Sequence, residues 1–284
     1  MHEDTRTELI QKLQRLEEER YILHEGERLQ DFTYLMLRHI GDPEAELREH
    51  IYSTFYIWLK RDNKFSCEEL RQLLAVLMDD RHLFCRIGSE GDHSVLTRAF
   101  AVLPIALIVQ RDRNNPFLTP GEFEHLKLSL LRYYQEEEDL RGYLAAEGWA
   151  HAAAHGADAL EELIRHPKSD NAVQHEVLVA IKGMLHNGVR IFDEEEDERM
   201  ASIVDTMISE ALLPQQEIAG WIHSLSKCTE WPDTRAQRIA RVNGKHFVRS
   251  LYFRTTARNN SHNLILNGAM LTAEAELNCF NDVE

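Results

Sequence analysis

Apolar and polar positions alternate along most of this chain with the period of an α-helix. Between positions 5 and 24, leucines recur at intervals of four, three and seven residues with charged residues between them, which places the leucines on one helical face. Comparable segments follow to the end of the chain, about a dozen in all. No convincing run alternates with the two-residue period of a half-buried strand. The pattern therefore predicts an all-α fold.

Several of these segments begin with residues that cap helices. Ser66 precedes Glu69 by three positions, and Thr119 precedes Glu122 by three; both are capping boxes, in which the two side chains satisfy free backbone N–H groups. Asp42 before a proline is a further cap candidate. The segment from 92 to 110 has little polar surface, so we expect it at the centre of the protein.

Two acidic runs indicate an internal repeat. Residues 134–141 and 192–199 both contain an aromatic residue, acidic residues and an Asp-x-Arg triplet, 58 positions apart. Weaker similarities occur elsewhere in the chain. The distances between these similar segments are close to the length of one HEAT or armadillo repeat. We therefore expect a HEAT/armadillo-like α-α superhelix, a solenoid of stacked helical pairs, as one domain over residues 1–284. The acids would begin helices and the arginines would pair between repeats, as a structural network of Asp139, Arg141, Asp197, Arg199 and Arg98.

Residues 148–158 form the most unusual segment, Gly-Trp-Ala-His-Ala-Ala-Ala-His-Gly-Ala-Asp. If residues 139–165 form one helix, four polar side chains share one side of it, and Trp149 packs on the opposite side. We call this polar side the histidine face; it comprises His151, His155, Asp158 and Glu162. It is the candidate binding site, with Trp149 beside it.

The histidine face has three interpretations. The histidines could fix helix packing through carboxylates of adjacent helices, or contact a binding partner in a groove. Alternatively, His151, His155 and Asp158 could bind a divalent transition metal, because histidines four residues apart on a helix reach one ion. The segment is not the HExxH protease motif, since Ala152 replaces the glutamate. The chain also lacks GxSxG and the glycine-rich nucleotide motifs, so no catalytic residue is assigned and no other cofactor is expected.

Charge makes nucleic acid an unfavourable partner. The 284 residues carry a net charge of −16, whereas phosphate binding requires a positive surface. The exception is residues 232–262, with seven Lys or Arg and one acid. We expect this basic C-terminal helix to pair with acids of the chain itself. There are two alternatives. The helix could bind an acidic partner, or it could bind nucleic acid if it is exposed.

The expected location is the cytoplasm. The first residues are charged and lack the apolar stretch of a signal peptide, and the longest apolar run, Ala99–Val109, is about half of a membrane span. The four cysteines are scattered without a CxxC spacing, as in proteins with reduced thiols. No membrane partner is therefore expected.

Three segments resemble the signature of a bacterial family with a domain of unknown function: residues 138–143 (Glu-Asp-Leu-Arg-Gly-Tyr), 148–151 and 154–158. Residues 196–199 and 98–103 are further landmarks, with Ala99 where the family has serine. The resemblance covers about residues 40–210 and implies a helical-repeat protein of the bacterial cytoplasm without an assigned activity.

The leading functional hypothesis is a non-enzymatic interaction or scaffold module, with a concave polar site around His151, His155 and Asp158. Its partner would be another protein or a second copy of the chain. A metal-dependent hydrolase using the same face is the first alternative. A nucleic-acid-binding helical repeat is the second.

Overall fold

A computed structural model describes residues 2–257 and 264–280 of the chain, and it confirms the all-α prediction. Within these residues there are twelve α-helices and only one short β-hairpin. The chain divides into two compact units, residues 1–162 and 163–284. That it forms one continuous domain stays a prediction.

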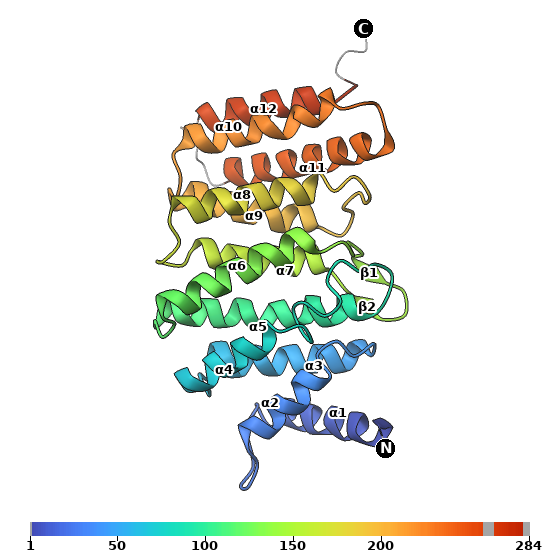
Figure 1. The fold of residues 1–284 in the computed structure, drawn as a ribbon, viewed down its shortest axis with the longest axis vertical. Coiled ribbons are helices and arrows are strands. Elements are labelled where there is room, and N and C mark those ends of the chain that lie inside the picture. Colours follow the sequence, from blue (N-terminus) through green and yellow to red (C-terminus); the bar gives the residue numbers. More distant parts are fainter. Residues whose placement is uncertain (1, 258–263, 281–284) are drawn as a thin grey trace. The chain divides into compact units, whose positions relative to one another are not determined.

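The first unit contains the hairpin and most of α7 (Figure 1). Its elements are α1 (His2–Glu18), α2 (Leu29–Arg38), α3 (Ala45–Tyr56), a π-helical turn (Ile57–Arg61), α4 (Cys67–Leu77), α5 (Ser94–Asn114), α6 (Pro120–Glu136), β1 (Tyr143–Leu144), β2 (Gly148–Trp149) and α7 (Ala152–Ile164).

The second unit is entirely helical in its described part. Helix α11 packs against α9 and α12, and α10 packs against α12. The elements are α8 (Asn171–Leu185), α9 (Glu196–Ser209), α10 (Gln215–Leu225), a 3₁₀ turn (Ser226–Glu230), α11 (Arg235–Ala257) and α12 (Leu264–Leu277). The predicted basic helix is α11, and positions 258–262 of the prediction lie outside the described residues.

Helix α5 is the central helix of the first unit, as predicted. Helices α3 and α4 both pack against it, and its apolar residues are buried on all sides. By length and composition α5 could cross a membrane, but 78% of its most apolar window is buried inside the protein. Its apolar character is therefore explained by its place in the core.

The capping boxes at Ser66 and Thr119 are both present and begin α4 and α6. The cap predicted at Asp42 is wrong by two residues, because α3 begins at Ala45 and Glu44 occupies the cap position. The Asp42 carboxylate instead accepts the backbone N–H of Glu44 at 2.9 Å.

The predicted continuous helix over 139–165 is wrong. The chain forms an antiparallel hairpin in which Tyr143 lies opposite Trp149, and α7 begins only at Ala152. Gly148 and His151 have positive φ angles of 75° and 55°. A residue in this left-handed region cannot continue a right-handed helix, so the segment turns twice before α7.

Candidate functional site

The hairpin presents two aromatic side chains to solvent. Tyr143 is 54% exposed and Trp149 is 38% exposed, and their rings meet edge to face with centroids 5.1 Å apart. The expectation that Trp149 packs on the buried side of a helix is therefore wrong, because Trp149 lies in β2, before α7 begins. We call β1, β2 and these two side chains the aromatic hairpin.

His151 joins the aromatic hairpin to α7. Its ring stacks on Trp149 at 4.8 Å with an interplanar angle of 24°. Its backbone N–H donates to the Arg141 carbonyl at 3.1 Å, and its carbonyl accepts the N–H of His155 in the first turn of α7. The left-handed backbone at His151 is thus held from both sides, which is the setting in which such strain persists.

His155 is oriented by the central helix. Its Nδ1 lies 3.0 Å from the Ala99 carbonyl; because a carbonyl can only accept, Nδ1 carries the proton. The ring also meets Phe100 edge to face at 5.6 Å. Pro104 of α5 has no N–H for the Phe100 carbonyl, so the helical ladder is interrupted next to the carbonyl that His155 uses.

The four residues of the histidine face do not act as one group. The rings of His151 and His155 are together, with centroids 5.7 Å apart. Glu162 accepts from Gln110 at 2.7 Å and pairs with Arg113 at 3.2 Å, so it fastens α7 to α5. Asp158 is half-buried on α7. No three His, Cys, Asp or Glu side chains among the described residues form a group that could hold a metal ion, so the geometry does not favour the predicted metal set.

Arg48 holds the hairpin in place through hydrogen bonds to its carbonyls, a role that the sequence did not reveal. It is 1% exposed, and its guanidinium donates to the carbonyls of Glu147, Trp149 and Asp42. It also lies over the Phe100 ring, 4.8 Å from the centroid. Burial lowers the pKa of Arg48, although nearby acids oppose the shift. A charged residue between apolar positions of α3 was the available signal.

Near the first acidic run, the predicted charge network contains a pair between neighbours in the sequence. Asp139 pairs with Arg141 through contacts of 2.7 and 2.6 Å and accepts the Gly91 N–H at 3.0 Å. Arg98 instead pairs with Glu137, which the sequence analysis did not single out, through two contacts of 2.7 and 2.6 Å. Both side chains are buried. Burial raises the pKa of Glu137, and the Arg98 hydrogen bonds oppose that effect.

Near the second acidic run, the network joins α9 to α11. Asp197 accepts the Ser250 hydroxyl at 2.8 Å, and Glu198 pairs with Arg254 at 2.6 Å. Arg199 lies in the first turn of α9, where its N–H donates to the Glu195 carbonyl.

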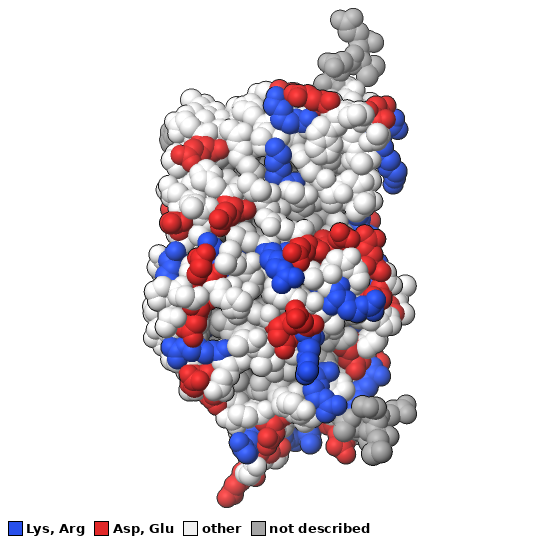
Figure 2. All heavy atoms as spheres, viewed as in Figure 1, with Lys and Arg blue, Asp and Glu red and all other residues white. Residues whose placement is uncertain are grey.

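The predicted pairing of the basic helix with the acidic body of the chain is confirmed for Arg254, while Arg249 pairs with an acid of α12 and Arg238 with the one acid of the basic segment itself. The pairs are Arg254–Glu198, Arg249–Glu274 and Arg238–Asp233. Figure 2 likewise shows basic and acidic side chains interspersed on the face drawn, without a continuous basic stripe. This arrangement does not favour the nucleic-acid alternative.

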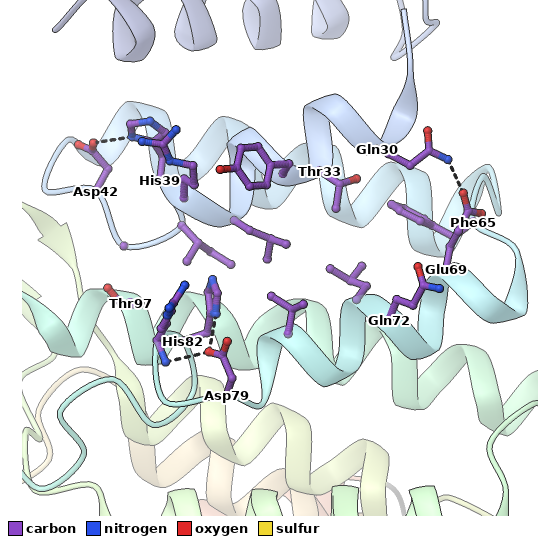
Figure 3. Close-up of a pocket in the computed structure, with 18 residues that line it drawn as sticks. Gln30, Thr33, His39, Asp42, Phe65, Glu69, Gln72, Asp79, His82 and Thr97 are labelled. Carbon is purple, nitrogen blue, oxygen red and sulfur yellow. Dashed lines mark hydrogen bonds and ion pairs between the residues drawn. The ribbon is translucent and has the colours of Figure 1, made fainter. Parts of the chain in front are cut away.

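A pocket of about 790 Å³ lies between α2 and α4 in the first unit (Figure 3). We call it the α2–α4 pocket. The apolar side chains of its lining are Tyr34, Leu37, Ile40, Phe65, Leu73 and Val76, and Phe65 lies near Gln30 and Glu69 (Figure 3). Gln30, Glu69 and Gln72 lie at one end, and His39, Asp42, Asp79 and His82 at the other (Figure 3). Sequence reasoning missed this pocket, since no motif marks it.

Each histidine of the pocket is paired with an aspartate. His82 Nδ1 lies 2.7 Å from Asp79 Oδ1, and His39 Nδ1 lies 3.4 Å from Asp42 Oδ2. Gly41 is required beside this end, because a Cβ there would lie 2.0 Å from the Thr97 hydroxyl.

Comparison with known proteins identifies one family. A family model described as protein of unknown function, DUF2785, matches residues 83–253, which overlap the region carrying the resemblance noted in the sequence. No curated protein matches the chain, and no solved structure does. That the Gly-Trp-Ala-His and Ala-His-Gly-Ala-Asp segments are the signature of the family stays a prediction.

Proposed function

The chain belongs to the DUF2785 family of proteins of unknown function, and we propose that it is a cytoplasmic interaction module that presents the aromatic hairpin and the adjoining histidines to a partner protein. Its helices would stack as a HEAT-like solenoid, and the partner would contact Tyr143, Trp149 and His151.

The rigid mounting of two exposed aromatic side chains carries this proposal. Surface tryptophan and tyrosine are enriched among residues that dominate binding energy. Here they sit on a hairpin whose carbonyls are held by the buried Arg48 guanidinium, so little conformational freedom would be lost on binding.

The histidines would supply polar contacts next to the aromatic pair. His151 stacks directly on Trp149, and His155 and Asp158 follow it along α7. A half-buried polar group beside an aromatic anchor matches the composition of interfaces, with an apolar centre and a polar rim.

Photo-crosslinking tests the proposal while the partner is still unidentified. The photoreactive amino acid p-benzoylphenylalanine is placed at position 143, and the full chain is irradiated in cells of its source organism. We expect an adduct of one defined mass, reduced at least several-fold by Trp149→Ala. An adduct of twice the mass of the chain would identify a second copy as the partner.

A matched position controls for surface exposure. Phe253 on α11 is 69% exposed and lies far along the chain from the hairpin, so the same probe there reports incidental contacts. The proposal is wrong if positions 143 and 253 give the same adducts, or if Trp149→Ala leaves the adduct at position 143 unchanged.

A further inference from the structure

We propose that the α2–α4 pocket binds a small amphiphilic monocarboxylate, with an aliphatic chain along the apolar lining and the carboxylate at the end formed by His39 and His82. This site is separate from the aromatic hairpin and does not depend on the function proposed for it.

The size and lining of the pocket suit such a ligand. Its volume of about 790 Å³ falls within the range of roughly 300–1,000 Å³ found for small-molecule sites. Leu37 and Ile40 of the α2 region and Leu73 and Val76 of α4 contribute apolar lining. An aliphatic chain placed there would cover apolar surface that water now contacts.

Two arginines of the pocket lining would bind the carboxylate of the ligand. Arg38 and Arg81 both line the pocket, directly before His39 and His82 in the sequence. Arg38 lies against the Tyr34 ring, 5.8 Å from its centroid, and neither arginine has a carboxylate partner in the described part of the chain. For a protein with a net charge of −16, two such arginines on one pocket are a specific feature.

The aspartates at this end are already occupied. Asp42 pairs with Arg6 at 2.5 Å in addition to His39, and Asp79 accepts the backbone N–H of Arg81 at 2.8 Å in addition to His82. Arg6 offsets the negative charge of Asp42, and the hydrogen bonds to Asp79 occupy its carboxylate. The aspartates also hold the imidazoles in place through Nδ1, and the guanidinium groups of Arg38 and Arg81 would donate to the carboxylate head group.

The opposite end selects for a single charge. Glu69 there accepts from Gln30 at 2.5 Å and from the hydroxyl of Ser66 at 2.7 Å, and these hydrogen bonds lower its pKa. This anionic side chain would repel a second carboxylate, so a dicarboxylate is disfavoured. Guanidinium groups match the planar carboxylate through paired hydrogen bonds.

Isothermal titration of the full chain with decanoate, decanol and decylamine tests the head group. These probes share the chain and differ in charge. We expect decanoate to bind at least tenfold more tightly than the other two. Equal affinities for decanoate and decylamine, or no binding of decanoate, would overturn the proposal.

Paired variants locate the site. Arg38→Ala/Arg81→Ala should weaken decanoate binding at least tenfold, whereas Arg235→Ala, an exposed arginine outside the pocket, should leave it unchanged. Val76→Trp should block the apolar part of the pocket. Its control is Val179→Trp on α8, at a position 64% exposed and outside the pocket.

Thermal unfolding of each variant shows that it is folded, and the affected side chains are surface residues, so folding should be retained. Wild-type decanoate affinity in both the double arginine variant and Val76→Trp would show that the ligand binds elsewhere and would refute the proposal.

Discussion

The acidic runs at 134–141 and 192–199 share a pattern of residues but occupy opposite ends of helices. The first begins in the last turn of α6, and its Glu137 turns inward to the buried Arg98. The second leads into the first turn of α9, where Glu198 pairs with the partly exposed Arg254. The same charges therefore terminate one helix and initiate another.

The difference teaches that the environment decides the role of a charge. Glu137 is the C-cap residue of α6 and pairs with a buried arginine, whereas Glu198 is partly exposed and lies near the positive end of the α9 dipole. Removing individual contacts from each run should therefore have effects of very different size.

The largest effect is expected for Arg98→Leu. It leaves the Glu137 carboxylate buried without its bidentate partner, and breaking one side of a buried ion pair costs about 3–5 kcal/mol. Urea unfolding measures the loss. Arg98→Leu/Glu137→Leu should recover most of it, because neither charge of this buried pair then remains. Equal losses in the single and double variants would show that shape, rather than charge, matters here.

Asn243→Ala should have the next largest effect, on the loop before the second run. The buried Asn243 accepts the N–H of Phe192 and donates to the carbonyls of Leu185 and Arg190. Leaving these backbone groups unsatisfied should lower the free energy of unfolding by about 2–3 kcal/mol. The exposed Asn171→Ala should change it little; similar losses in both variants would contradict this role.

Arg254→Ala tests the second run directly. The Arg254–Glu198 pair is partly solvent-exposed, so its loss should cost less than about 1 kcal/mol and should diminish in high salt. The Arg98→Leu loss should be much less sensitive to salt. Unfolding of both variants at low and high salt makes the comparison, and a salt-independent Arg254→Ala loss would argue against an exposed pair.

The pH dependence of stability compares the first turns of α6 and α9. The Thr119 backbone N–H and hydroxyl lower the pKa of Glu122 at the start of α6, whereas the Glu195 side chain at the cap position of α9 makes no cap hydrogen bond within the described residues. Because folding lowers the pKa of Glu122, its carboxylate stabilises the folded state at pH values above its ordinary pKa of about 4.5. This stabilisation is lost as the pH falls through the lower pKa that Glu122 has in the folded state.

Glu122→Gln should therefore destabilise by about 0.5 kcal/mol at neutral pH, and the difference from wild type should shrink as the solution is acidified. Thermal unfolding over a pH series measures it. The control Glu124→Gln lies in the same helix outside the cap. A difference that grew on acidification would contradict the assignment.

The smallest effect is a gain, from Glu195→Gly. Glu195 has φ = 66°, a conformation that costs a side-chain-bearing residue about 1–2 kcal/mol, while glycine loses about 0.5–1 kcal/mol through unfolded-state entropy. A net gain of about 0.5 kcal/mol is expected in urea unfolding. Its neighbour Glu194 has an ordinary φ, so Glu194→Gly should destabilise; the opposite ranking would refute the argument.

Local signals in the sequence predicted most helices correctly. The capping boxes at Ser66 and Thr119 depend on residues three positions apart, and the burial of α5 follows from its composition alone. The hairpin was missed because the alanine-rich segment after Trp149 favours a helix. The left-handed turn at His151 depends on contacts with Arg141 and on the fixed hairpin, which no local pattern encodes.

The candidate site was predictable only in part. His151 and His155 lie together as expected, because only one turn separates them. The burial of Arg48 and Glu137 depends on partners far away in the sequence. The α2–α4 pocket depends on the spacing between two helices, which the identities of Arg38 and Arg81 do not determine.

The contact between Arg48 and the aromatic hairpin also has a consequence for folding. Arg48 is separated by 99 residues from the Glu147 carbonyl and by 101 from that of Trp149, so the anchor forms only after a long stretch of chain has closed on itself. Such non-local contacts form slowly. During synthesis, the hairpin would therefore remain unanchored until the first unit had folded.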